Sequence, residues 1–250
     1  MKDILFSIVI LTYNNLYFTE QCLKAVIAHT HSPYELILID NGSTDATVKF
    51  LKGLKLPFMK KKINSMNLGF AKGGNQGAAL AEGKYLVFLN NDTLPEENWV
   101  EELGFAIEKF NRIGIVGSLL LFPDRTIQHS GVGFGPPYYV HHLYKGKEET
   151  YPPAQTPRIL QAVTGACLLI PRNLFFQVHG FEENYLNGFE DLDLCFKVRK
   201  QGYRILYWPK SVLVHFESLS SGRKKWDEKN LQLFKEKWDG FVLQDIQFYP

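Results

Sequence analysis

Short, continuous apolar runs alternate with helical patterns through the first half of this chain, and that alternation restricts the fold more than any other feature. The apolar runs predict strands at 4–11, 34–40 and 84–89, with a weaker strand at 57–62. The segments between them predict helices at 16–29, 43–51 and 73–82, and Pro95 predicts the start of a helix that reaches Phe110. This order is typical of an α/β fold in which helices cover both faces of a Rossmann-like, mostly parallel central sheet.

The second half of the chain is less regular. We expect strands at 113–122, 158–170, 203–207 and 212–216, a helix at 190–200 that Gly202 ends, and a terminal amphipathic helix at 226–238. Residues 136–157 hold five prolines and are rich in tyrosine, which indicates an excursion from the sheet rather than a linker. With 250 residues, a single large domain over 1–250 is the best expectation.

The composition argues against several classes of protein. Apolar residues make up 45% of the chain, which is enough to exclude a mainly disordered state. The net charge of +2 gives no reason to expect a nucleic-acid partner. The three cysteines lie far apart without zinc-ligand spacing, so we expect neither a disulfide scaffold nor a structural zinc site. This cysteine usage fits a reducing compartment, and a cytoplasmic location is expected. No apolar run is long enough to span a bilayer.

Polar loops follow three of the predicted strands. Residues 12–15 follow the first strand, 40–43 the second and 90–93 the fourth. Open parallel sheets bind ligands beyond the carboxyl ends of their strands, so these loops predict a ligand site along one edge. Asp92, in the last loop, can hold a hard divalent cation that bridges two phosphates. A turn that closes on its own backbone accounts for this aspartate equally well.

A second acidic signal lies at 188–193. Acidic residues in the first turn of a helix stabilise it through the helix dipole, and this effect alone can explain Glu190 and Asp191. The loop before them, with Tyr185 and Asn187, suits contact with a polar ligand, and a carboxylate there can remove a proton from an attacking hydroxyl. Both interpretations stay open from the residues alone.

Two further segments suit a phosphate or sugar ligand. His215 ends a predicted strand, and it is either a buried hydrogen-bonding residue or a metal ligand. The basic run at 220–225 that follows it is either a solvated surface or a source of charge beside a diphosphate. The glycine-rich segment 67–75 lacks a dinucleotide fingerprint, and its glycines serve either close approach to a ligand or tight helix–sheet packing.

Seven motifs occur along the chain: TYNN at 12–15, DNGSTD at 40–45, NLGFAKGGN at 67–75, FLNNDT at 88–93, TGACLLIPR at 164–172, GFEDLDL at 188–194 and HFES at 215–218. In this order they resemble the family 2 inverting glycosyltransferases with a GT-A fold, particularly the bacterial rhamnosyltransferase-like members. The resemblance covers residues 5–220, nearly the whole chain. It divides the domain into a nucleotide-binding half at 1–95, an acceptor and catalytic half at 96–220, and a basic loop and helix at 221–250.

The resemblance implies a nucleotide-diphosphate-sugar donor, with dTDP-rhamnose or a UDP-sugar as candidates. Asp40 would accept the N3–H of a pyrimidine base, and Arg223 would supply charge to the leaving diphosphate. Residues of three polar segments would complete the nucleotide site: Thr12, Tyr13, Asn14, Asn67, Gly69, Phe70, Asn75 and Asn91.

The resemblance also implies a divalent cation, Mg²⁺ or Mn²⁺, held by Asp92 and His215. Asn90 stands where the family pattern has an aspartate, and an amide is a weaker ligand than a carboxylate. Asp191 matches the catalytic base that removes the proton of the acceptor hydroxyl, and Glu190 would bind the acceptor.

The expected acceptor is a glycan or a lipid-linked sugar, in the synthesis of a cell-surface polysaccharide. Tyrosine and histidine side chains of 136–157 are candidates for its rim, with ordinary loop packing as the alternative. The terminal helix can either pack on its own domain, which we favour, or touch the inner face of a membrane. The alternative function is a non-catalytic domain that binds a nucleotide sugar or a carbohydrate. The sequence leaves the oligomeric state open.

Overall fold

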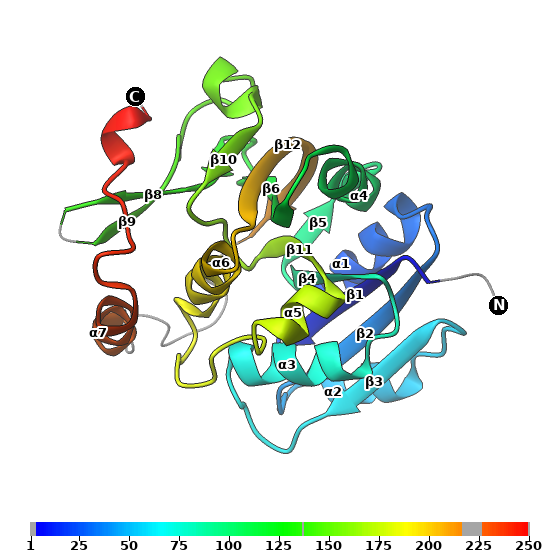
Figure 1. The fold of residues 1–250 in the computed structure, drawn as a ribbon. Coiled ribbons are helices and arrows are strands. Elements are labelled where there is room, and N and C mark those ends of the chain that lie inside the picture. The colour runs from blue at the N-terminus through cyan, green and yellow to red at the C-terminus, as the bar shows by residue number, and fades with distance from the viewer. Residues whose placement is uncertain (1–3, 137, 217–226, 250) are drawn as a thin grey trace.

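A mixed ten-stranded sheet forms the centre of the computed structural model, which describes residues 4–136, 138–216 and 227–249 (Figure 1). The strand order along its main path is β10-β12-β6-β11-β4-β1-β2-β3. β5 pairs with β12 and β7 with β6, while β8 and β9 form a separate hairpin.

The elements have the following bounds. The strands are β1 Phe6–Thr12, β2 Tyr34–Asp40, β3 Met59–Ile63, β4 Tyr85–Asn90, β5 Thr93–Pro95, β6 Ile113–Leu121, β7 Ile127–His129, β8 Val132–Gly135, β9 Tyr139–His142, β10 Arg158–Leu160, β11 Cys167–Pro171 and β12 Arg204–His215. The α-helices are α1 Leu16–His29, α2 Thr47–Gly53, α3 Phe70–Leu80, α4 Trp99–Lys109, α5 Arg172–Gln177, α6 Glu190–Lys200 and α7 Asp227–Trp238. Two short 3₁₀ helices are η1 Pro152–Gln155 and η3 Ile246–Phe248.

Four parallel strands, β4-β1-β2-β3, form one half of the sheet. The apolar residues of β1 and β2 are buried almost without interruption because helices cover both faces. Helices α1, α2 and α4 pack on one face, and α3, α5 and α6 pack on the other. β11 runs antiparallel between β4 and β6 and so joins this half to the second one.

Helix α3 lies close to the sheet because its inner face consists of glycine and alanine. A Cβ atom on Gly73 would lie 2.6 Å from Leu11 Cδ2, and one on Gly77 would lie 2.3 Å from Val9 Cγ1. No larger side chain fits at these positions, which explains the small residues of this helix. The close approach sets the N-terminus of α3 beside the ends of β1 and β2.

The structure corrects several expectations in the second half. Pro95 does not begin a helix; it ends β5, opposite Leu213 of β12, and α4 begins at Trp99. The expected strand at 158–170 is two strands, β10 and β11. The expected strands at 203–207 and 212–216 are one strand, β12, whose pairing with β6 shifts register after Trp208. Pro209 follows Trp208 and has no N–H for the ladder, which accounts for the separate sequence patterns.

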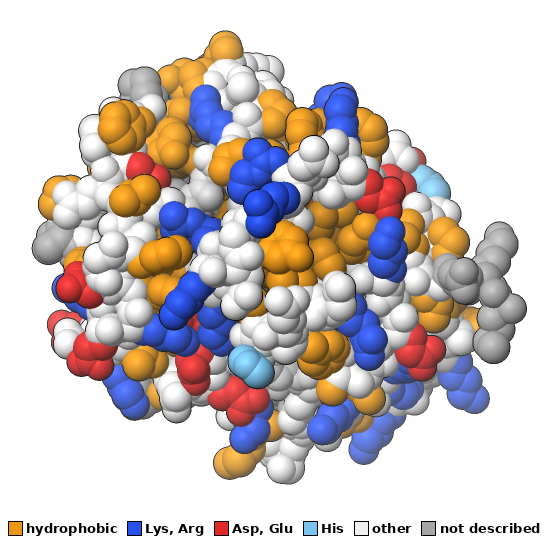
Figure 2. Space-filling view, viewed as in Figure 1, with side chains coloured by type: hydrophobic (Ala, Val, Ile, Leu, Met, Phe, Trp, Pro, Cys, Tyr) orange, Lys and Arg blue, Asp and Glu red, His pale blue; other side chains and the backbone are white. Residues whose placement is uncertain are grey.

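The terminal helix α7 packs on its own domain, as we favoured. Phe234 and Trp238 are buried in the same core as α6, and the rings of Phe234 and Phe196 lie 5.2 Å apart. Trp226 lies outside the described residues. Within the part of the chain that the structure describes, no helix combines the length and the apolar character that a membrane span needs. On the face shown in Figure 2, lysine and arginine side chains are interspersed with acidic and apolar ones.

Candidate functional site

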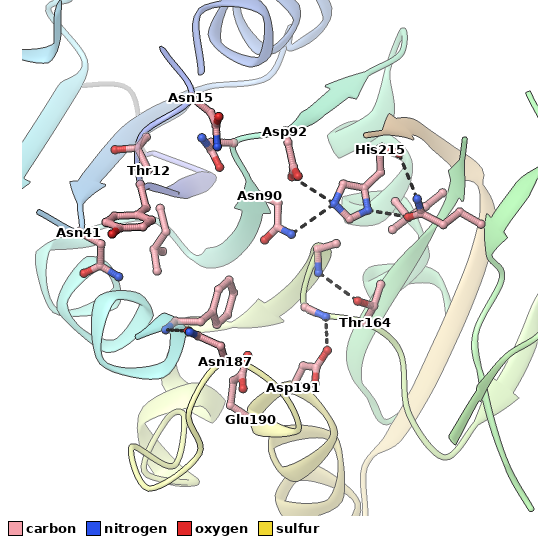
Figure 3. Close-up of a pocket in the computed structure, with 18 of the residues that line it drawn as sticks. Thr12, Asn15, Asn41, Asn90, Asp92, Thr164, Asn187, Glu190, Asp191 and His215 are labelled. Carbon is pink, nitrogen blue, oxygen red and sulfur yellow. Dashed lines mark hydrogen bonds and ion pairs between the residues drawn. The ribbon is translucent and has the colours of Figure 1, made fainter. Parts of the chain in front are cut away.

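A cavity lies at the carboxyl ends of β1 and β4, at the edge where the sequence predicts a ligand (Figure 3). Both halves of the chain contribute to its walls. The structure brings the following predicted site residues together there: Thr12, Tyr13, Asn67, Phe70, Asn91, Asp92, Glu190, Asp191 and His215.

Asp92 and His215 meet on one wall of this cavity. His215 Nε2 lies 3.1 Å from Asp92 Oδ1, although 123 residues separate them in sequence. The pairing of β5 with β12 sets His215 opposite Thr93, the residue after Asp92. The N–H of Phe216 also donates to the main-chain oxygen of Asp92 at 3.0 Å. The sheet, rather than local sequence, therefore brings the two side chains together.

Gln128 of β7 fixes the ring of His215. Its Oε1 lies 2.5 Å from His215 Nδ1, and its Nε2 donates to the main-chain oxygen of His215 at 3.0 Å. An amide oxygen only accepts, so Nδ1 carries a proton and Nε2 is the ring nitrogen left to bind a cation. Histidine ligands of metals are commonly oriented in this way through their other nitrogen.

The donor set at this wall fits Mg²⁺ or Mn²⁺. Asp92 supplies a carboxylate oxygen and His215 an imidazole nitrogen, and diphosphate oxygens and water would complete the shell. Asn90 adjoins the pair, with its Nδ2 3.4 Å from His215 Nε2. Among residues 4–136, 138–216 and 227–249 there is no group of three or more His, Cys, Asp or Glu side chains that could hold an ion. Within those residues, Asp92 and His215 are the two side chains of this wall suited to bind a cation.

Glu190 and Asp191 begin α6, as predicted, and both line the cavity. Asp191 Oδ2 accepts the N–H of Gly165 at 2.7 Å, and its Oδ1 accepts the N–H of Leu192 at 2.8 Å. Glu190 Oε2 accepts the N–H of Gly188 at 2.6 Å. These main-chain bonds hold both carboxylates in place at the cavity wall. A general base must lie within hydrogen-bond distance of the proton that it removes, so a fixed position is its first requirement.

Asp40, expected to accept the N3–H of the base, is not among the residues that line the cavity. Its side chain is fully buried, and its Oδ1 accepts the hydroxyls of Thr12 at 3.1 Å and Ser43 at 2.6 Å. Its Oδ2 accepts the N–H groups of Gly42 and Ser43 at 3.1 and 3.0 Å, which closes the turn after β2. The role of Asp40 at the base stays a prediction. Its neighbour Asn41 lines the cavity instead.

Asn14 and Gly69, also predicted to bind nucleotide, shape the turns behind the cavity rather than line it. Asn14 Oδ1 accepts the N–H of Thr44 at 2.7 Å. Helix α2 begins at Thr47, after this turn, and not at residue 43 as the sequence predicts. Gly69 has a φ of 83°, which favours glycine, and its oxygen accepts Asn41 Nδ2 at 3.0 Å.

Asn75 is likewise not among the lining residues. Its Oδ1 accepts the N–H of Phe181 at 2.9 Å, and its Nδ2 donates to the oxygen of Phe181 at 2.9 Å. We call a side-chain amide that bonds both the N–H and the C=O of one main-chain residue an amide clamp. Arg223, expected near the diphosphate, lies outside the described residues.

Sequence reasoning missed Asn41, Gln128 and Gly165 as cavity residues. Asn41 lies within the polar loop after β2, where an amide beside an aspartate carries no separate sequence signal. Gln128 lies in a three-residue strand, and its role depends on the distant His215, which no local pattern reveals. An added Cβ on Gly165 would lie 3.1 Å from Asp191 Cβ, so this glycine lets the loop approach the carboxylate.

A histidine pair adjoins the same loop, and of the two His129 is fully buried while His142 is half-buried and lines the cavity. His129 Nδ1 lies 2.7 Å from His142 Nδ1, and the N–H of Thr164 donates to His129 Nε2 at 3.3 Å. Burial, together with the nearby His142 and His215, lowers the pKa of His129 well below its ordinary value. Consecutive N–H groups of one loop thus bond His129 and Asp191.

The three cysteines take no part in this site. All are buried thiols, and burial raises the pKa of Cys22, Cys167 and Cys195 to about 12. Since the thiolate is the reactive form, these residues do not serve as nucleophiles.

A family model described as Glycosyl transferase family 2 matches residues 7–173. The O-antigen biosynthesis protein RfbC of Myxococcus xanthus is 31% identical over 79% of this chain. The N-acetylglucosaminyl-diphospho-decaprenol L-rhamnosyltransferase of Mycobacterium tuberculosis is 26% identical over 89% of it. The chain spans 16% of the length of RfbC and 79% of the length of the rhamnosyltransferase.

Two solved structures have a similar fold. GalNAc-T7 with UDP, GalNAc and Mn²⁺ has a TM-score of 0.78 at 20% identity, covering 95% of this chain and 49% of that one. The mannosyltransferase PcManGT from Pyrobaculum calidifontis, in complex with GDP-Man and Mn²⁺, has a TM-score of 0.70 at 18% identity, covering 100% and 68%. These likenesses confirm the GT-A fold that the sequence motifs imply.

Proposed function

The chain belongs to glycosyl transferase family 2, and on that premise we propose that it moves a sugar from a nucleotide-diphosphate donor to an acceptor hydroxyl, with inversion. The observation that carries this proposal is a single cavity lined by Asp92 and His215 as well as by Asp191. The first two residues suit a cation and a diphosphate, and Asp191 suits an acceptor.

Asp191 would take the proton from the acceptor hydroxyl as that oxygen attacks the anomeric carbon. The N–H groups of Gly165 and Leu192 hold the carboxylate at the cavity wall throughout. Glu190, also at the wall and bonded to Gly188 N–H, would accept a hydrogen bond from a second acceptor hydroxyl. One displacement from the face opposite the diphosphate inverts the anomeric centre, and a single carboxylate base is sufficient for it.

The leaving diphosphate would lie at the wall formed by Asp92 and His215. These two side chains would hold Mg²⁺ or Mn²⁺, which when bound neutralises charge on the diphosphate. The nucleotide would lie along the loops after β1 and β2 and the start of α3. The residues that support this placement by lining the cavity are Thr12, Tyr13, Asn41, Asn67, Phe70 and Asn91.

For the donor we propose a pyrimidine nucleotide, with dTDP-rhamnose or a UDP-sugar as the species. The name of the mycobacterial relative, an L-rhamnosyltransferase, and the UDP in the GalNAc-T7 structure support this choice. The GDP-Man in PcManGT makes a purine donor the competitor. For the acceptor we propose a glycan or lipid-linked sugar of a cell-surface polysaccharide, in keeping with the names of both relatives.

The test is a donor screen with the intact chain. UDP-glucose, UDP-GlcNAc, dTDP-rhamnose and GDP-mannose are each incubated with MnCl₂, and nucleotide release is followed by mass spectrometry. We expect release from a UDP- or dTDP-sugar, and its loss in excess EDTA. Release from GDP-mannose alone would overturn the pyrimidine assignment, and full activity in EDTA would overturn the cation. Tight nucleotide binding without any release or transfer would favour a non-catalytic binding domain.

A further inference from the structure

The loop before α6 has an unusual backbone. Asn187, Gly188 and Phe189 have φ values of 56°, 148° and 72°, three consecutive positive values of which two belong to residues other than glycine. Such conformations are unfavourable for L-residues and persist only where the surroundings hold them. Something in the structure must therefore fix this loop.

Asn230 of α7 provides that fixation. Its Oδ1 accepts the N–H of Leu186 at 3.2 Å, and its Nδ2 donates to the oxygens of Leu186 and Gly188, each at 3.0 Å. This is an amide clamp on Leu186 with an added bond to Gly188. The Asn230 side chain is only 1% exposed, so these bonds form away from competing water.

The clamped loop carries groups of the site. Asn187 lines the cavity, and its Oδ1 accepts the N–H of Phe70 at 3.3 Å, which ties the loop to the start of α3. The N–H of Gly188 donates to Glu190 Oε2 at 2.6 Å. Asp191 is the next residue of the helix. A shift of this loop would therefore move the first turn of α6, where both carboxylates lie.

Helix α7 is itself a firm support. The indole N–H of Trp238 donates to Asp193 Oδ1 at 2.8 Å, and Lys237 forms an ion pair with the same oxygen at 2.8 Å. The ring of Phe234 lies 5.5 Å from that of Phe189. Helix α7 thus contacts α6 and the loop before it, on the side away from the central sheet (Figure 1).

We infer that Asn230 is a positioning residue for the proposed sugar transfer: it holds the loop 186–188 so that the carboxylates at the start of α6 face the cavity. The inference rests on the proposed function, and Asn230 lies beyond residues 7–173, which the family model matches. It makes turnover depend on a helix that contributes no residue to the cavity wall.

The experiment compares Asn230→Ala with Gln161→Ala. Gln161 is a matched control because it forms an amide clamp of the same kind, on Leu243, with bonds of 2.9 and 2.7 Å, and it does not line the cavity. For each variant we would measure thermal unfolding, kcat, the Kd for UDP with Mn²⁺, and hydrogen exchange by peptide. All kinetics are run at a temperature where every variant is folded.

We expect Asn230→Ala to lower kcat by about 10- to 100-fold, the scale of a small misplacement of reacting groups. The nucleotide Kd should change by less than about threefold, because the substitution slows the transfer step and leaves donor binding unchanged. Exchange should accelerate in peptides covering 185–191 and not in those of β1 or β4. Gln161→Ala should keep kcat within about threefold of the parent chain.

A kcat for Asn230→Ala equal to that of Gln161→Ala would overturn the inference, as would unchanged exchange at 185–191. If Asn230→Ala does not fold, Asn230→Asp replaces it, because it keeps the acceptor for Leu186 N–H and loses both donated bonds; the same criteria apply. If the parent chain transfers no sugar from any donor, the proposed function fails and takes this inference with it. An active parent with an unaffected variant removes the inference alone.

Discussion

The two sides of the cavity are built in different ways. On the side proposed for the nucleotide, Thr12 ends β1, and Asn41 and Asn91 directly follow β2 and β4, so the register of the sheet positions them. On the side proposed for catalysis, the loops 163–166 and 185–189 are irregular, and single polar side chains such as His129 and Asn230 hold them. Substitutions in the core beneath the strand-built side should therefore lower mainly the free energy of unfolding. Substitutions in the two irregular loops should instead lower mainly kcat.

The sharpest test of the catalytic side is Asp191→Asn. Asparagine keeps the shape of the side chain but cannot take up the acceptor's proton, so kcat should fall by about 10²- to 10⁴-fold. The Kd for the nucleotide with Mn²⁺ should change little, and calorimetry beside single-turnover assays would separate the two quantities. Asp124→Asn is the matched control, since Asp124 also accepts a main-chain N–H, that of Thr126 at 2.9 Å, but is exposed and does not line the cavity. A normal kcat for Asp191→Asn would move the base role to Glu190.

Gln128→Leu tests whether a single side chain prepares the cation site. Without the amide oxygen, His215 Nδ1 loses its acceptor, and the affinity for Mn²⁺ in the presence of UDP should fall by about 10- to 100-fold. Electron paramagnetic resonance of free Mn²⁺ measures this directly. Gln128→Glu keeps an acceptor for Nδ1–H and should retain most of the affinity. Equal Mn²⁺ binding by the parent and by Gln128→Leu would show that the ring of His215 needs no such support.

Gly77→Ala tests the strand-built side of the cavity, where we expect a loss of stability rather than of rate. The added Cβ would lie 2.3 Å from Val9 Cγ1, and this overpacking should lower the free energy of unfolding by about 1–3 kcal/mol. Gly53→Ala is the control, because nothing lies within 4 Å of its Cβ and alanine favours the helix by up to about 1 kcal/mol. Urea denaturation compares the two. If Gly77→Ala changed kcat more than stability, the contrast between the two sides would be wrong.

The smallest expected effect is a pH dependence of stability from His129. Its pKa is lowered in the folded chain, so below the ordinary value of 6.5 the unfolded chain binds a proton that the folded chain does not. Stability from this group is complete above pH 6.5 and falls as the pH decreases, by up to about 1.4 kcal/mol per pH unit. Urea midpoints at pH 7.5 and 5.5 for the parent chain and His129→Gln measure it. An equal change in midpoint between the two pH values for both chains would mean that folding does not lower the pKa of His129.

The parts of the structure that sequence could predict are those set by local pattern. Strands β1, β2 and β4 appear in the sequence as unbroken apolar runs. Helix α6 has acidic residues in its first turn and basic residues in its last turn, and these mark its bounds at Glu190 and Lys200. The site residues found from sequence lie directly at the ends of these elements. Local pattern did not predict the structure where pairing with a distant strand determines it. Pro95 lies in a strand because Leu213 pairs with it, and β12 continues past Pro209 because both of its parts pair with β6.

The burial of Asp40 behind the cavity wall could not be predicted from the sequence for a related physical reason. An aspartate after a strand can face a ligand or close its own turn, and the choice depends on which N–H groups lie nearby. Here the groups of Gly42 and Ser43, with two hydroxyls, take up the carboxylate. Asn75 similarly bonds Phe181, 106 residues away, and nothing in the sequence between them signals that contact.

The long sequence separation of Asp92 and His215 also bears on how the chain matures. Their 123-residue separation means that this pair of side chains forms only after β12 has been synthesised and has paired with β5. The strands β1 to β4 can pair before that moment from contacts much nearer in sequence. An ion and diphosphate bound at this wall would then stabilise only the completed sheet, by mass action. A cation bound by Asp92 and His215 would thus report that β12 has paired with β5.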